Sequence, residues 1–308
     1  MKKLMMSILL LIVLGFTVTY QQEIVNHIMI NYVYKKEIVI QEINEYKRDL
    51  DFNYVKRTDN FFPKSEEDIL NIFYTVLNNG WDEFTFYCDT EYESCLDDIQ
   101  RISHDEYIFS NVNNFVHPYN SYNRLSINYN NLGKISIQIE KLYTSAEISA
   151  VNNKVNEIYS SIIKDNMSTR DKILAIHDHI INTTDYDNER AEIITKNISN
   201  YPYTYESHKA FGTLLQGMAI CSGYSDAMAV FLNKMGIPNY KVASKDHVWN
   251  LVYLDNNWYH LDLTWDDPIV DTNEPILVHN YFLITTKELE KEPNDQHIYS
   301  KDVYSEAR

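Results

Sequence analysis

One stretch of the chain decides its fold. Residues 207–268 read SHKAFGTLLQGMAICSGYSDAMAVFLNKMGIPNYKVASKDHVWNLVYLDNNWYHLDLTWDDP. Apolar residues recur at helical spacing in the first half of it: Ala227, Val230, Phe231 and Met235. Gly236-Ile237-Pro238 ends this helix, since glycine suits a left-handed cap and proline cannot continue the helix. Cys221 opens the helix, where backbone N–H groups and the positive dipole end favour a thiolate and supply an oxyanion donor. Cys221 is therefore a candidate nucleophile; the alternative is a packing residue.

Two segments of alternating polarity follow the helix. Residues 247–254 and 258–264 flank Asp255-Asn256-Asn257 and predict a β-hairpin. With a two-residue primed turn at Asp255-Asn256, facing residues have numbers that sum to 511. A two-residue turn one position later would leave the same residues on each face of the hairpin. A three-residue turn would place His247 and Asp262 on opposite faces.

This register places Asp262 opposite Trp249 and diagonally from His247 on one face of the hairpin. Diagonal neighbours lie about 7–8 Å apart at Cα, within reach of an imidazole and a carboxylate. Asp262 can then orient His247, and His247 can face Cys221, which supplies an orienter, a base and a nucleophile. His260 shares the face but lies two residues from Asp262 in the same strand, so His247 is the better candidate base. The alternative is an ordinary half-buried sheet.

Three sequence blocks resemble bacterial transglutaminase-like domains. They are G-M-A-I-C-S-G-Y, then D-H-V-W-N-L-V, then W-Y-H-L-D-L-T-W-D-D-P. The upstream DKILAIHDHIINTTDYD is similar to the leading helix of that family, and HNYFLIT at 279–285 to its closing strand. The resemblance covers about residues 150–285 and implies a papain-like α+β fold with Cys221 as nucleophile, His247 as base and Asp262 as orienter. It also implies a transglutaminase-like acyltransferase or cysteine peptidase.

Other polar residues of this region give weaker signals. Gln216, five residues before Cys221, is the candidate side-chain oxyanion donor, with a solvated loop glutamine as the alternative. Four carboxylates follow the hairpin: Asp266, Asp267, Asp271 and Glu274. Their spacing fits no EF-hand, so an acidic turn is the favoured interpretation over calcium. Neither a zinc-ligand spacing nor a phosphate-cradling glycine loop occurs in the sequence, and we expect no cofactor.

The N-terminus has the pattern of an export signal. Lys2-Lys3 precede an uncharged apolar run from Leu4 to Tyr20, and no alanine for a usual cleavage site occurs before Ala146. We expect an uncleaved anchor that holds the rest of the chain outside the cytoplasm; a cleaved signal and a buried core helix are the alternatives. The run of 17 residues is at the lower limit for a membrane span.

The remaining cysteines are Cys88 and Cys95, seven residues apart. In an oxidising compartment an even pair tends to close, so we expect a disulfide that leaves Cys221 free. Two unpaired, buried thiols are the alternative.

The sequence before the decisive stretch divides into segments of different character. We expect an anchor or signal at 1–20, a stem at 21–60, and a small α/β module at 61–145. In that module, Ser65 predicts a helix N-cap and Gly80 its end, and residues 124–130 and 134–140 predict a hairpin. The catalytic domain is expected at 146–285, with a C-terminal tail at 286–308.

Charge and composition bound the function. The net charge of −17 argues against nucleic acid, because phosphate binding draws on clustered lysine and arginine. We expect a protein or peptide substrate, associated with the envelope or surface, and either cross-linking or hydrolysis of amides through a thioester. The alternative from another class is a catalytically silent envelope-binding or scaffold protein that keeps the fold.

Overall fold

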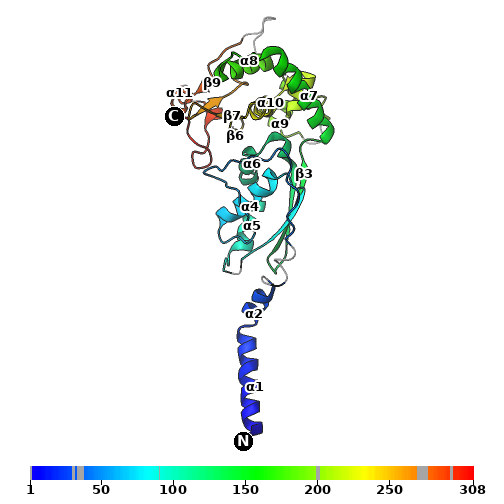
Figure 1. Cartoon of the computed structure of the whole chain (residues 1–308), viewed down its shortest axis with the longest axis vertical. Helices are drawn as coiled ribbons and strands as arrows, with labels where there is room; N and C mark the ends of the chain where they lie inside the picture. Colours follow the sequence, from blue (N-terminus) through cyan, green and yellow to red (C-terminus); the bar gives the residue numbers. More distant parts are fainter. Residues whose placement is uncertain are drawn as a thin grey trace.

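The computed structural model describes residues 2–29, 32, 38–89, 91–198, 202–268, 277–291 and 294–308. Figure 1 shows an elongated body in two parts, with α1 (Lys2–Thr19) and α2 (Gln21–Ile28) projecting from its narrow end. The part nearer α2 holds a three-stranded sheet with its helices. The far part holds the helices and the four-stranded sheet of the decisive stretch.

The first part of the body is built from residues that precede Ser145. Its elements are α4 (Glu66–Asn78), β1 (Glu83–Tyr87), α5 (Cys95–Ser103), α6 (Glu106–Asn114), η2 (Pro118–Asn120), β2 (Tyr122–Tyr129) and β3 (Lys134–Lys141). Ser65 caps α4, as predicted, by accepting a hydrogen bond from Asp68 N, and Gly80 follows the helix at φ +73°. The three strands form an antiparallel sheet in the order β1-β3-β2, which includes the predicted hairpin.

A disulfide joins Cys88 to Cys95, with 5.9 Å between their Cα atoms. It links the chain just after β1 to Cys95, the first residue of α5. Cys221 is the free cysteine of the described residues.

The segment predicted as a stem differs from that expectation. Residues 38–60 have no regular helix or strand, and they lie along the body instead of spanning a gap. The Arg48 backbone N–H donates to Asn78 Oδ1, while Asn78 Nδ2 donates back to Arg48 O. Val55 is fully buried in the core of the first part. Burial of such side chains fixes the segment to the body.

The second part of the body begins with a helical layer. Its elements are α7 (Ser145–Ile162), α8 (Thr169–Asn182), β4 (Asp185–Tyr186), α9 (Asn188–Thr195), η3 (Gly212–Gln216), β5 (Met218–Ala219) and α10 (Cys221–Lys234). Ser168 and Asp171 form a capping box at the start of α8. Residues 223–232 of α10 are all buried, so this helix runs through the interior instead of presenting one apolar stripe.

An antiparallel sheet packs against α10. It consists of β6 (Asn239–Ala243), β7 (Val248–Leu254), β8 (Asn257–Leu261) and β9 (Phe282–Ile284), in that order. Asp255 and Asn256 form the β7–β8 turn at φ +50° and +65°, as the two-residue primed turn requires. Asn250 therefore faces Leu261, which confirms the predicted register.

The C-terminal residues do not form a free tail. They comprise α11 (Thr286–Leu289), η4 (Asp295–His297) and a bridge between Tyr299 and Ser244 next to β6. Tyr304 is buried and donates to Asn111 of α6 while accepting from Asn114. The end of the chain thus joins the two parts of the body through a shared core.

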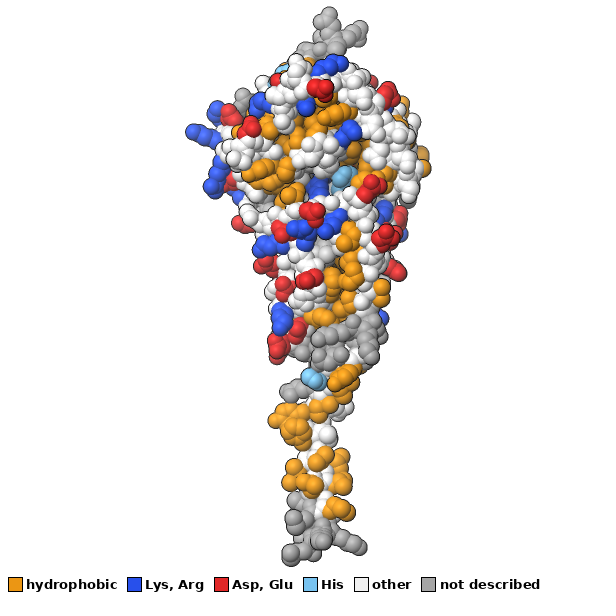
Figure 2. All heavy atoms as spheres, viewed as in Figure 1, with side chains coloured by type: hydrophobic (Ala, Val, Ile, Leu, Met, Phe, Trp, Pro, Cys, Tyr) orange, Lys and Arg blue, Asp and Glu red, His pale blue; other side chains and the backbone are white. Residues whose placement is uncertain are grey.

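The predicted membrane anchor is wrong. Among the described residues, no helix combines the length and the apolar character that crossing a bilayer requires. The location assigned from residues 4–20, extracytoplasmic and anchored, is corrected accordingly. Figure 2 shows apolar side chains along this helix, and several of them are exposed.

Candidate functional site

Cys221 is the first residue of α10, as the sequence predicted. Its side chain is partly exposed and its thiol is free. Among the described residues, the backbone N–H groups of Cys221 and Ser222 have no hydrogen-bond acceptor. Both therefore remain available as donors at the start of the helix. Gly223 keeps this turn close to the preceding loop, because a Cβ there would collide with the carbonyl oxygen of Ser207. That carbonyl also accepts from Ile220 N at 2.9 Å.

His247 and Asp262 meet at the open end of the β7–β8 hairpin. His247 lies just before β7 and Asp262 just after β8, and 2.6 Å separates His247 Nε2 from Asp262 Oδ2. With Nε2 on the carboxylate, Nδ1 is the nitrogen left for the hydrogen bond between His247 and the Cys221 side chain. The structure therefore brings together the three residues that the sequence singled out.

His247 and Asp262 each stabilise the charged form of the other. Burial acts to lower the pKa of His247, but the Asp262 carboxylate and the hydrogen bonds with Asp262 and Cys221 outweigh burial and raise that pKa to about 10. Burial acts to raise the pKa of Asp262, yet the neighbouring imidazoles and their hydrogen bonds hold it well below its usual range. At neutral pH His247 is thus held as an imidazolium between an anionic carboxylate and the thiol.

Sequence reasoning missed His297, which binds the same carboxylate. Its Nε2 lies 2.9 Å from Asp262 Oδ2, and the ring packs against Trp265 and Tyr281 at centroid distances of 4.8 and 5.0 Å. Asp262 Oδ1 accepts in turn from the backbone N–H groups of Thr264 and Trp265 at 3.0 and 3.3 Å. Four donors therefore hold the Asp262 side chain in place.

The contacts of His297 with Asn294 decide which ring nitrogen donates to Asp262. Asn294 Oδ1 accepts from the backbone N–H of His297 at 3.0 Å, which turns Asn294 Nδ2 toward Nδ1 of the ring at 2.9 Å. Nδ1 must then accept, so the proton sits on Nε2 and is donated to Asp262. No local pattern signals this contact, because His297 lies 35 residues beyond Asp262 in the chain.

His260, the competing histidine, serves another purpose. Its Nδ1 accepts from Trp249 Nε1 at 2.9 Å and its Nε2 lies 3.0 Å from Thr286 Oγ1. Burial lowers the pKa of His260 to about 3, which leaves the ring neutral. Both nitrogens are occupied, so the structure places His247 rather than His260 on Asp262.

Two further residues border the site. Gln216, the predicted oxyanion donor, is exposed at the end of η3, and its Oε1 accepts from Glu206 N at 2.8 Å. Its Nε2 remains a donor, and its role stays a prediction. Burial, then the charges of Cys221, Asp187 and Asp262, raise the pKa of Tyr186 to about 12. Tyr186 is therefore a neutral phenol close to the Cys221 thiol, and the sequence alone did not identify it as a residue of the site.

The acidic residues after the hairpin serve as local hydrogen-bond acceptors. Asp266 is fully buried and accepts from Tyr281 N at 2.9 Å, and Asp267 accepts from Tyr224 Oη. Asp271 and Glu274 lie outside the described residues.

Two groups of described residues bring three potential metal-ligand atoms within 4.8 Å of one another: His177, Asp178 and His279, and His247, Asp262 and His297. In both groups the atoms engage each other in hydrogen bonds, at 2.6–2.9 Å.

A cysteine at a helix start, facing a sheet that presents a histidine and an aspartate, is the arrangement found in papain-like cysteine enzymes. Residues 156–263 match the model of the transglutaminase-like superfamily, so this stretch of the chain is similar to the core domain of that superfamily. That superfamily has cysteine protease or acyltransferase-like activity.

Individual relatives are distant. The kyphoscoliosis peptidase of Mus musculus is 25% identical over 165 residues, which cover 47% of this chain and 24% of that protein. The crystal structure of a TGase is similar with a TM-score of 0.36 and 20% identity, over 60% of this chain and 50% of that one. A proposed cysteine protease from Cytophaga hutchinsonii gives a TM-score of 0.27 and 15% identity, over 46% and 61%. The chain thus spans about a quarter of the length of the curated relative.

Proposed function

We propose that this protein is a transglutaminase-like cysteine enzyme that acts on protein or peptide amides through a thioester at Cys221, by cross-linking or hydrolysis. The observation that carries the proposal is His247, held as an imidazolium between the Asp262 carboxylate and the Cys221 thiol. A thiolate is the nucleophilic form of cysteine, and a neighbouring imidazolium stabilises it.

The chemistry follows from the position of each group. The Cys221 sulfur attacks the carboxamide carbon, and the carbonyl oxygen becomes an oxyanion that the backbone N–H of Cys221 can stabilise. Gln216 Nε2 is a proposed second donor. His247 then gives its proton to the departing ammonia or amine, and the C–N bond breaks to leave a thioester.

The second half-reaction releases Cys221. Neutral His247 accepts a proton from an incoming amine or water as that nucleophile attacks the thioester carbon. The C–S bond breaks and the thiolate is restored beside the imidazolium. An amine gives a cross-linked amide and water gives a carboxylic acid. Asp262 keeps the imidazole oriented throughout and stabilises its charged form.

Labelling by iodoacetamide at neutral pH tests this proposal without a known substrate. Rapid, single-site alkylation of Cys221 that slows when His247 is replaced by Asn is the expected result. Incorporation of a fluorescent primary amine into casein, compared with release of casein peptides, then separates cross-linking from hydrolysis. Cys221 that alkylates no faster than a free cysteine would reject the assignment and favour a binding protein that keeps the fold.

A further inference from the structure

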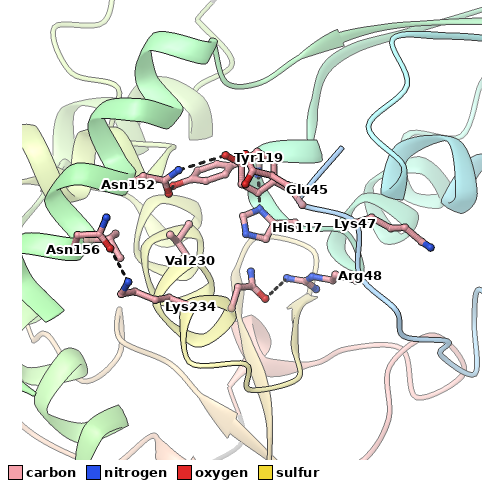
Figure 3. Close-up of a pocket in the computed structure, with 12 residues that line it drawn as sticks. Glu45, Lys47, Arg48, His117, Tyr119, Asn152, Asn156, Val230 and Lys234 are labelled. Atoms are coloured by element: carbon pink, nitrogen blue, oxygen red, sulfur yellow. Dashed lines mark hydrogen bonds between the residues drawn. The ribbon is translucent and has the colours of Figure 1, made fainter. Parts of the chain in front are cut away.

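A polar cavity of about 420 Å³ lies away from the cysteine site, between α7, α10, η2 and residues 45–48. Figure 3 shows Arg48 on one side of it, with His117 and Tyr119 above and Lys234 beside Asn156 on the other side. Its volume is in the range of small-molecule sites. Cys221 opens α10 whereas Lys234 ends it, which separates the two by about 20 Å along the helix.

The charge of the cavity is opposite to that of the protein. The whole chain has 44 acidic and 27 basic residues, yet the cavity is lined by three basic side chains and one acidic, Glu45. Lys47, at the edge, forms an ion pair with Asp49 at 3.2 Å, and in Figure 3 its ammonium points away from the other labelled residues. Arg48 and Lys234 are the two cations left to bind a ligand.

Arg48 is a buried cation with only neutral partners. Its Nη1 donates to the carbonyls of Phe115 and Asn239 at 3.1 and 2.7 Å, and its Nη2 has only side-chain amide oxygens at 3.4 Å. Burial lowers its pKa to about 10, so the guanidinium still carries its charge at neutral pH. Among the described residues no carboxylate forms an ion pair with it; the Asp226 carboxylate acts on Arg48 only through its charge and is itself paired with Lys241 at 2.7 Å. A buried charge without a directly bonded counter-charge is unfavourable.

Several donors around the cavity also lack acceptors. Arg48 Nε and Asn233 Nδ2 are buried without a hydrogen-bond partner. His117 Nδ1 accepts from Tyr119 N at 3.1 Å, so the proton of this neutral ring lies on Nε2, for which the described residues supply no acceptor. Lys234, by contrast, is exposed and donates from Nζ to Asn156 Oδ1 at 2.6 Å; among the described residues it has no carboxylate partner. Buried donors without acceptors are costly, and a ligand rich in acceptors would satisfy them.

We propose that this cavity binds a small oxyanion, a molecule bearing a carboxylate or phosphate group, with Arg48 and Lys234 as its charged contacts and His117 as a neutral donor. Guanidinium and ammonium groups bind such oxygens through charge-assisted hydrogen bonds. Val155 and Val230 also line the cavity and offer apolar contacts to a ligand. This binding site does not depend on chemistry at Cys221.

The test is isothermal titration calorimetry on the full chain with sodium phosphate, citrate and acetate, against sodium chloride at equal ionic strength. We expect saturable binding of at least one oxyanion with a Kd of about 1 mM or tighter, and the three oxyanions separate phosphate from carboxylate recognition. Lys234→Met should weaken binding about tenfold or more, since a charge-assisted hydrogen bond is lost. Lys234→Arg should retain it.

Matched variants separate a local site from a general charge effect. Lys154→Met removes the same charge from the exposed face of α7, where Lys154 pairs with Glu157 at 3.0 Å, and should leave the affinity unchanged. Cys221→Ala should bind as tightly as the unaltered chain, so this result is independent of the proposed enzymatic function. Absence of saturable binding for all three oxyanions, or equal weakening by Lys154→Met and Lys234→Met, would overturn the proposal.

Discussion

His297 Nε2 lies 2.9 Å from the same oxygen of Asp262 that binds His247 at 2.6 Å. The aspartate thus receives one imidazole from the hairpin and a second from the C-terminal segment, beyond the residues that match the superfamily model. His297 does not contact Cys221 in any hydrogen bond of the described residues, so its effect on the proposed chemistry must pass through Asp262. We propose it as a positioning residue, and its replacement can be designed to separate that role from packing.

Replacing His297 by Phe should lower turnover about tenfold or more, because Asp262 loses one charge-assisted hydrogen bond. The phenyl ring keeps the packing against Trp265 and Tyr281. His297→Gln retains an N–H donor at the position of Nε2 and should restore most of the turnover. Asp262 loses a donor to its charged form, so the acid limb of the pH–rate profile should move to higher pH in the Phe variant. Equal turnover and equal pH–rate profiles of the Phe and Gln variants would show that His297 does not position Asp262.

Replacing Cys221 by Ala should abolish acyl transfer and leave the free energy of unfolding nearly unchanged. The side chain is partly exposed at the start of α10 and fills no core position. The casein assay measures the loss of acyl transfer, and urea denaturation measures the free energy of unfolding. Retention of turnover by the Ala variant would rule out Cys221 as the nucleophile.

Replacing Asp262 by Asn should reduce turnover by up to about 10⁴, because an amide can donate to His247 Nε2 and favour the wrong tautomer. A thiolate–imidazolium pair that already exists before the reaction would make the loss smaller. The alkylation rate of Cys221 and the turnover should fall together. Unchanged values of both would exclude Asp262 as the orienter.

Stability should depend on pH through His247. Its pKa in the folded protein is about 10, above the ordinary value of 6.5. A raised histidine pKa contributes stability that is fully present below about 6.5 and is lost as the pH rises toward 10. Urea midpoints of the unaltered chain should fall through this interval by more than those of His247→Asn. Parallel pH curves for the two proteins would contradict the raised pKa.

Replacing Lys241 by Met should destabilise the fold by about 3–5 kcal/mol, because it leaves the buried Asp226 carboxylate without its cation. Lys241 Nζ lies 2.7 Å from Asp226 Oδ1, and Tyr143 Oη donates to Oδ2 at 2.8 Å. This network fixes α10 to β6. The double variant Lys241→Met with Asp226→Asn should recover much of the loss in urea denaturation. A cost of the single substitution below about 1 kcal/mol would show that the pair is not effectively buried.

The elements that sequence predicted best are those set by neighbouring residues. Gly236-Ile237-Pro238 and Cys221 bound α10 almost to the residue, because caps and breakers act within one helical turn. The turn at Asp255-Asn256 fixed the hairpin register, and a register decides which side chains share a face. His247 and Asp262 could therefore be paired from spacing alone. The apolar run at residues 4–20, by contrast, suggested a membrane span that the structure does not support.

Contacts between distant segments were decided by the tertiary structure. Trp249 and Thr286 occupy the nitrogens of His260, which settles the competition between two histidines that share one face of the hairpin. His297 reaches Asp262 only because the C-terminal segment folds back across the sheet, and Arg48 meets Asn233 and Asn239 only because residues 38–60 pack on the body. Hydrophobic burial drives such long-range packing and carries no local sequence period. The sequence by itself therefore determined the helix, the hairpin and their three candidate catalytic side chains, while only the folded chain supplied the second imidazole and the basic cavity.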